Sequence, residues 1–130
     1  MILTFYTLIA LIASIQDIRT RNVSDLVHIL IILIAIPSLC AYNILGGIIG
    51  GLLFLAPNFK CNGSMGGADI KFMFASGLLL GSVKITIATI IGLIVAIIFT
   101  KLSNFILKKD EKRIAYIPYL SIGCIIAFLI

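Results

Sequence analysis

Acidic side chains are scarce in this chain, and two of them stand where a carboxyl group suits chemistry. Of the 130 residues, five are acidic. Asp17 follows an apolar run at the N-terminus, and Asp69 ends a glycine-rich stretch that precedes another apolar run. A carboxylate next to a membrane-like segment is costly, so such an acid is a functional candidate. Asp25 beside Ser24 is predicted instead to be an ordinary helix N-cap, and the other two acids belong to the basic, solvated stretch 108–113.

Two carboxyl groups that converge at a water-accessible membrane edge suit peptide hydrolysis. Because like charges at short range cannot both ionise, the pair shares a proton: one carboxyl activates water and the other protonates the scissile carbonyl. A carrier coupled to ions or protons and an inactive assembly scaffold are the alternatives. A carrier would place its carboxylates near the membrane midplane, whereas Asp17 and Asp69 fall at predicted helix ends. Asp17 also has the simpler alternative of an ion pair with Arg19 or Arg21, and Asp69 that of a helix N-cap.

Other chemistries have weaker support in the sequence. The stretch 62–69 lacks the Gly-Lys-Ser/Thr ending of a phosphate-binding loop. Cys40, Cys61 and Cys124 are far apart, and His28 is the only histidine. Neither a structural zinc site nor a thiol protease is therefore expected, and we predict no metal and no cofactor.

The composition predicts a polytopic, all-α membrane protein with a single domain, 1–130. Hydrophobic residues make up 62% of the chain and charged residues 12%, with a mean hydropathy of +1.25. A soluble domain carries roughly 45–50% apolar and about 25% charged residues, which excludes a soluble enzyme, a disulfide scaffold and a disordered tail. No Lys or Arg precedes Arg19, so the first apolar run is predicted to be a retained span rather than a cleaved signal peptide.

Apolar runs separated by breaks predict six transmembrane helices in a compact bundle. They are predicted at 1–16, 26–42, 44–57, 70–83, 85–100 and 114–130. The alternative of four helices merges 26–57 and 70–100 into runs of about 47 Å, too long for a hydrocarbon core of about 30 Å. The first merged run also contains Pro37, Asn43 and a glycine pair, and the second contains the break 81–84.

The basic residues predict the orientation of this bundle. With six spans, nine of the ten Lys and Arg residues fall on one side, and Lys84 alone falls on the other. The positive-inside rule makes the basic side cytoplasmic and puts the N-terminus outside. Both candidate aspartates then face the cytoplasm. This orientation accounts for the net charge of +5 without a nucleic-acid partner, and His28, Lys84 and the tyrosines are predicted to be interfacial residues.

Glycines at a spacing of four residues predict close contacts between helices. Gly46, Gly47, Gly50 and Gly51 form two overlapping pairs, and Gly77 with Gly81 repeats the spacing. Small residues at this spacing let two helix backbones approach closely in a membrane. We therefore expect these glycines to serve packing rather than ligand binding.

Two segments of the chain resemble motifs of the type IV prepilin peptidase family, which includes archaeal preflagellin peptidases. The segment 16–23, QDIRTRNV, resembles the first motif, an Asp followed by a basic, polar stretch that enters the second helix. The segment 66–71, GGADIK, resembles the G-x-G-D-x-K box. The helix predicted after this box and the segment 116–119 with Gly123 are also similar to the family.

The resemblance implies a membrane-embedded aspartic endopeptidase with Asp17 and Asp69 as its catalytic residues. Its substrates would be prepilin-like precursors, from which it removes a short basic leader at the cytoplasmic face of the plasma membrane. The partners implied are this substrate and the lipid bilayer, while the oligomeric state is left open. Gly66 and Gly67 would let the backbone turn so that Asp69 reaches Asp17. Lys71 would steady a carboxylate or anchor the helix at lipid headgroups.

Two departures from the family pattern refine this expectation. Ala68 replaces the second glycine of the box, and its extra methyl group is expected to be tolerated. The chain starts at its first predicted helix, without the paired C-x-x-C region linked to N-methylation, so we expect a peptidase without N-methyltransferase activity.

Helix polarity further predicts that Asp69, at a helix N-terminus, is the base and that Asp17, at a C-terminus, is the acid.

Overall fold

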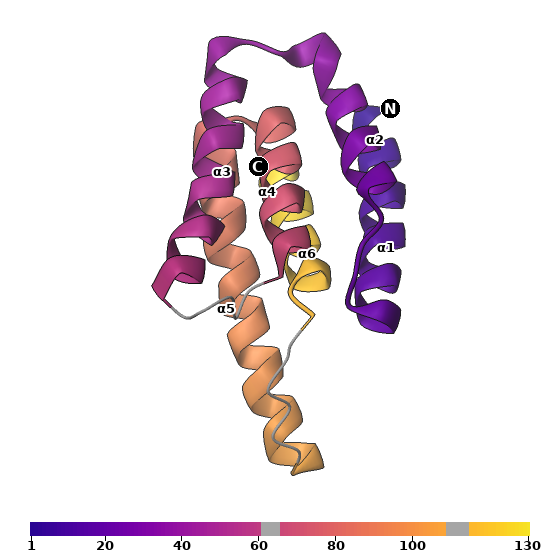
Figure 1. Ribbon diagram of the computed structural model, residues 1–130, viewed down its shortest axis with the longest axis vertical. Helices are drawn as coiled ribbons and strands as arrows, with labels where there is room; N and C mark the ends of the chain where they lie inside the picture. The colour runs from indigo at the N-terminus through magenta and orange to yellow at the C-terminus, as the bar shows by residue number, and fades with distance from the viewer. Residues whose placement is uncertain (61–65, 109–114) are drawn as a thin grey trace.

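The chain folds as an up-and-down bundle of helices (Figure 1). A computed structural model describes residues 1–60, 66–108 and 115–130. The helices are α1 (Ile2–Thr20), α2 (Asp25–Ala35), the 3-10 turn η1 (Ile36–Ser38), α3 (Ala41–Lys60), α4 (Gly67–Leu80), α5 (Ser82–Leu107) and α6 (Ile117–Leu129). The all-α prediction is confirmed.

Among the described residues, breaks in the two long apolar runs give six α-helices rather than four. The first run breaks at η1, which contains Pro37. Asn43 and the pair Gly46 and Gly47, also predicted to interrupt this run, lie inside α3 instead. The second breaks at Gly81, whose φ of 86° is a left-handed conformation that glycine adopts without strain. The helix α5 continues to Leu107, so the predicted loop 102–113 begins with helical residues.

The outer surface of the bundle suits a lipid environment. In the described part of the chain, α1, α3 and α5 are long and apolar enough to cross a membrane, and α2 with η1 and α6 are shorter apolar segments. Large apolar side chains such as Leu8 and Ile12 are exposed, while polar side chains such as Ser14 and Thr89 are buried. Six crossings and an external N-terminus stay predictions.

Glycine contacts explain how closely α3 packs on α4. A Cβ atom added to Gly46 would lie 2.5 Å from the carbonyl oxygen of Gly77, and one added to Gly77 would clash with the Gly46 carbonyl. A Cβ atom at Gly50 would likewise lie 2.5 Å from the Met73 oxygen. The predicted packing role is confirmed at these positions. Gly51 differs, because a Cβ atom there would make only ordinary contacts with Phe74.

Alternation of helix direction brings three chain segments to one end of the bundle (Figure 1). The end of α1, the start of α4 and the start of α6 meet there, and we call this the aspartate end because it contains Asp17 and Asp69. Further from it, the Tyr6 hydroxyl lies 2.9 Å from the Ser76 hydroxyl and ties α1 to α4. Tyr6 is fully buried. The prediction that the tyrosines are interfacial is therefore wrong for Tyr6, because its hydroxyl finds a partner in the core.

Candidate active site

Two buried carboxyl groups face the interior at the aspartate end. Asp17 is 6% exposed and Asp69 is 5% exposed, among side chains that are otherwise mainly apolar. They come from different helices, α1 and α4, and are far apart in the sequence. The fold therefore brings both sequence-predicted aspartates to one end of the bundle. Their proximity is sufficient for the negative charge of Asp17 to act on Asp69.

The carboxyl of Asp17 is held by the first residue of α6. The backbone N–H of Ile117 donates to Asp17 Oδ2 at 3.2 Å. The first N–H groups of a helix have no partner inside the helix, and the N-terminal end of the helix dipole favours a negative charge. From the sequence, the C-terminus of α1 was expected to disfavour a negative charge on Asp17. In the structure, the N-terminus of α6 opposes this effect. The predicted ion pair with Arg19 or Arg21 is not formed, since within 1–60, 66–108 and 115–130 the only ion pair joins Lys71 and Asp25.

Asp69 lies in the first turn of α4, before the apolar run predicted as a span. The helix starts at Gly67 with Gly66 as its N-cap residue, so Asp69 is the third helical residue rather than the cap. Its carboxyl accepts a hydrogen bond from the backbone N–H of Gly66, as acidic residues at this position often do. Burial, followed by the charge of Asp17, raises the pKa of Asp69 to about 7, and the Gly66 N–H acts in the opposite direction. A carboxyl with this pKa can hold a proton near neutral pH.

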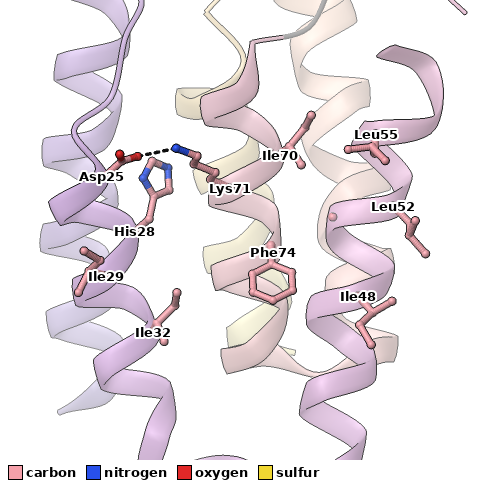
Figure 2. Close-up of a pocket in the computed structure, with 11 residues that line it drawn as sticks. Asp25, His28, Ile29, Ile32, Ile48, Leu52, Leu55, Ile70, Lys71 and Phe74 are labelled. Carbon is pink, nitrogen blue, oxygen red and sulfur yellow. Dashed lines mark hydrogen bonds and ion pairs between the residues drawn. The ribbon is translucent and has the colours of Figure 1, made fainter. Parts of the chain in front are cut away.

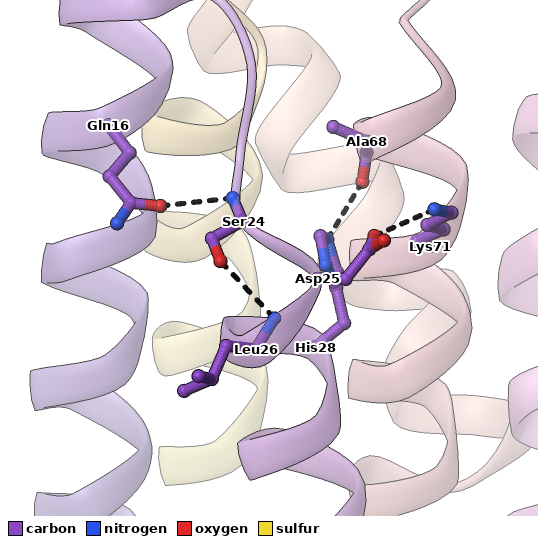
Figure 3. A network of polar contacts seen from close by, with 7 residues as sticks. All are labelled: Gln16, Ser24, Asp25, Leu26, His28, Ala68 and Lys71. Carbon is purple, nitrogen blue, oxygen red and sulfur yellow. Dashed lines mark hydrogen bonds and ion pairs between the residues drawn. The ribbon is translucent and has the colours of Figure 1, made fainter.

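The turn between α1 and α2 is fixed by polar side chains of the first motif (Figure 3). Gln16 Oε1 accepts from the backbone N–H of Ser24 at 3.1 Å. The Ser24 hydroxyl in turn accepts from the N–H of Leu26 at 3.4 Å, which makes Ser24 the N-cap of α2. The predicted N-cap role of Asp25 is therefore wrong, because Asp25 is already the first helical residue.

Asp25 instead joins α2 to α4. Its Oδ1 lies 2.7 Å from Lys71 Nζ, and both side chains are largely exposed (Figures 2 and 3). The hydrogen bond and charge of Lys71 hold the pKa of Asp25 below its ordinary value. Of the two roles considered for Lys71, the structure shows contact with a carboxylate, which is that of Asp25.

His28 makes a second link between the same helices. Its Nε2 lies 3.3 Å from the carbonyl oxygen of Ala68 (Figure 3). The residue is only 5% exposed, so the prediction of an interfacial histidine is wrong. Sequence reasoning predicted His28 to be an interfacial residue and gave Gln16 no role beyond its place in the first motif. The signal available for His28 was its spacing of three residues from Asp25, which places both on one face of α2.

The glycines of the box have no special backbone conformation. Gly66 has φ −66° and ψ 140°, which any residue adopts, and a Cβ atom on Gly67 would meet no described atom within 4 Å. The expected sharp glycine turn is absent at Gly66, and both glycines are exposed. Their lack of side chains leaves open space beside Asp69.

Other candidate chemistry has little support in the structure. Among the described residues, no three His, Cys, Asp or Glu side chains gather as a metal site would require. Cys40 and Cys124 are free thiols, and Lys84 lies 5.9 Å from the centre of the Phe128 ring. Cys61 and the basic stretch from 109 to 113 lie outside the described residues.

Comparison with known proteins gives one finding. A model of the type IV leader peptidase family matches residues 4–101. The match contains α1 to α4 and most of α5, and so both aspartates. Neither the curated proteins nor the solved structures contain a significant match.

Proposed function

Because this chain belongs to the type IV leader peptidase family, we propose that it is a membrane-embedded aspartic endopeptidase that acts through Asp17 and Asp69. The observation that carries this proposal is the pair of buried carboxyls at one end of the bundle, with the charge of one acting on the other. Its substrates are prepilin-like precursors, from which it removes the short basic leader at the cytoplasmic face of the plasma membrane.

The surroundings of the two carboxyls assign them different roles in hydrolysis. We assign the shared proton to Asp69, because burial and the charge of Asp17 both disfavour its anion, and the role of base to Asp17, which accepts the Ile117 N–H. This order is the reverse of the one that helix ends in the sequence predicted. Helix ends no longer separate the two carboxyls, because Asp17 meets the N-terminus of α6 and Asp69 stands at the N-terminus of α4. The difference used here is the charge of Asp17, which disfavours a second anion at Asp69. As a coupled pair, the two carboxyls titrate together.

The reaction proceeds in two proton-balanced steps. Asp17 takes a proton from water as the water oxygen bonds to the scissile carbonyl carbon, and Asp69 gives its proton to the carbonyl oxygen. The carbon–nitrogen bond then breaks. Asp17 passes its proton to the leaving nitrogen, and Asp69 recovers one from the collapsing hydroxyl group. Both carboxyls end in their starting states.

In this proposal, the glycines of the box leave room for the substrate, and Lys71 keeps two helices in position. The space at Gly66 and Gly67 admits the substrate backbone beside Asp69, because no side chain of the described residues fills it. Lys71 is a positioning residue, since its ion pair with Asp25 fixes α2 against α4. The position of both aspartates at one end, rather than midway along the helices, favours a peptidase over a carrier.

A reconstituted cleavage assay tests the proposed activity. Purified protein in liposomes is mixed with prepilin-like chains that carry a basic leader ending in Gly, and the products are identified by mass. We expect a single cut between the leader and the apolar segment. Intact chains in every mixture, beside a protein that retains its melting transition, would contradict the proposal.

A further inference from the structure

An apolar groove runs along the bundle between α2 and α3 (Figure 2). It has a volume of about 660 Å³. Its walls are formed by Ile29 and Ile32 of α2 and by Ile48 and Leu52 of α3, with Phe74 of α4 between them. Both α2 and α3 pack on α4, but they make little or no contact with each other. The bundle therefore leaves a lengthwise site where one more apolar helix can pack on α4.

Polar groups stand at one end of this otherwise apolar groove. Asp25, His28 and Lys71 line it at the aspartate end (Figure 2). The contact of His28 Nε2 with the Ala68 carbonyl assigns the ring hydrogen to Nε2, because a carbonyl oxygen only accepts. Nδ1 is then a hydrogen-bond acceptor that makes no hydrogen bond among the described residues, and the Ser24 carbonyl, which also acts on the ring, is itself an acceptor. A donor from a bound segment can satisfy Nδ1.

A polar pocket continues from this end of the groove toward the box. It has a volume of about 440 Å³, and it shares Asp25 and Lys71 with the groove. Its other walls include Asn22, Ser24 and Gly67. The two hollows therefore adjoin at the ion pair, with the apolar groove along the helices on one side and the polar pocket, next to the residues that precede Asp69, on the other.

We propose, on the basis of the peptidase function above, that the groove binds the apolar helix of the substrate with its N-terminus at His28 and Asp25, and that the polar pocket receives the leader. The first N–H groups of a helix lack partners and carry partial positive charge. His28 Nδ1 and the Asp25 carboxylate are acceptors suited to that end. The junction between leader and helix then lies beside the box.

Matched tryptophan substitutions test occupancy of the groove. Ile29→Trp and Ile48→Trp fill it from α2 and α3, whereas Leu33→Trp and Leu45→Trp alter comparably exposed positions of the same helices outside it. The probe is a synthetic chain with a lysine-rich leader ending in Gly and an apolar helix of about 20 residues. We expect both groove variants to lower kcat/KM about tenfold or more, through KM, and both controls to stay within about twofold. Equal rates for all four variants would overturn the groove proposal.

Cross-linking supplies a readout that does not depend on cleavage. In an Asp69→Asn protein without its native cysteines, Ile29→Cys is compared with Leu33→Cys for cross-linking to a cysteine on the apolar helix of the probe. Preferential coupling at position 29 supports the proposal. Capture of lipid or of a second copy of the chain at position 29, with the probe left free, would contradict it.

A separate substitution tests the role of His28 as a hydrogen-bond acceptor. His28→Phe keeps an aromatic side chain but removes both Nδ1 and the Nε2 contact with Ala68, and we expect KM to rise about three- to tenfold, as for the loss of one hydrogen bond to the substrate. An unchanged KM would remove His28 from the binding site. Failure of the wild-type protein to cut the probe would count against the peptidase function, whereas cutting that is insensitive to the groove variants would count against the groove alone.

Discussion

At the scale of single residues, the acidity of Asp69 is the property that connects this fold to chemistry. Burial removes its carboxyl from water, and the Asp17 charge further disfavours a second anion, so its pKa rises to about 7. Asp17 is also buried but accepts the N–H of Ile117. Two carboxyls in unlike surroundings can divide the roles of acid and base.

The activity should depend on pH through the proton of Asp69. Because the proposed mechanism needs this proton, we expect kcat to fall as the pH rises through about 7. A pH–rate profile with the synthetic probe checks this expectation. A rate that stays level from about pH 6 to about pH 9 would show that no such proton is needed.

Stability should depend on pH with a definite sign. The pKa of Asp69 is raised from 3.8 to about 7 in the folded protein, so the folded state binds more protons than the unfolded state between these values. The free energy of unfolding should therefore fall as pH rises across this window, by at most about 4 kcal/mol. Melting temperatures in detergent at about pH 5 and about pH 8 measure this. Asp69→Asn should stabilise the protein mainly at the higher pH. An equal change in melting temperature at both pH values would contradict the raised pKa of Asp69.

The sequence allowed both aspartates to be predicted, because few acids occur and these two adjoin apolar runs. It did not reveal how they are held. The N–H of Ile117 lies 100 residues from Asp17 along the chain, and no local pattern indicates such a contact. The N-cap of α2 was misplaced by one residue because Ser24 and Asp25 are both common capping residues.

At the scale of helices, backbone contact between α3 and α4 sets the position of Asp69. Gly46 and Gly77 face each other with no room for a methyl group, whereas a methyl group on Gly51 of α3 would make only ordinary contacts with Phe74. The glycine spacing predicted this interface. It did not predict the full length of α5, because its final turns are more polar than the apolar run from which the span was predicted.

A pair of alanine variants tests this interface. Gly77→Ala should destabilise the bundle by about 1–3 kcal/mol, because the added methyl group meets the Gly46 carbonyl. Gly51→Ala, its control, should leave stability unchanged or slightly improved, since alanine favours a helix. Thermal unfolding in detergent compares the two. Equal melting temperatures for both variants would show that the close approach of α3 and α4 is wrong.

At the scale of the whole molecule, alternating helices place the end of α1 and the starts of α4 and α6 at one end of the bundle, where the groove has its polar residues (Figures 1 and 2). The distribution of basic residues along the chain predicted that the two aspartates share this end. The groove could not be predicted in the same way. It depends on α2 and α3 both packing on α4 while leaving space between them, and apolar patterns do not specify which helices become neighbours.

The native cysteines provide a test of membrane orientation. Cys40 is exposed between η1 and α3, away from the aspartate end, and the positive-inside prediction places Cys61 in a cytoplasmic loop. With Cys124→Ala in both proteins, one variant keeps Cys40 and the other keeps Cys61. A membrane-impermeant maleimide should label Cys40 in intact cells and Cys61 only after lysis. The opposite pattern would invert the topology and place the active site outside.

The most direct test of the central claim is the cleavage rate of matched aspartate variants. Asp17→Asn and Asp69→Asn each preserve side-chain size while removing a carboxyl, and Asp110→Asn makes the same change in the basic stretch 108–113. With folding verified by melting temperature, we expect each of the first two variants to cleave about 10²–10⁴-fold or more slowly than the wild type. The third should cleave at the wild-type rate. Cleavage at the wild-type rate by either Asp17→Asn or Asp69→Asn would contradict a two-aspartate peptidase.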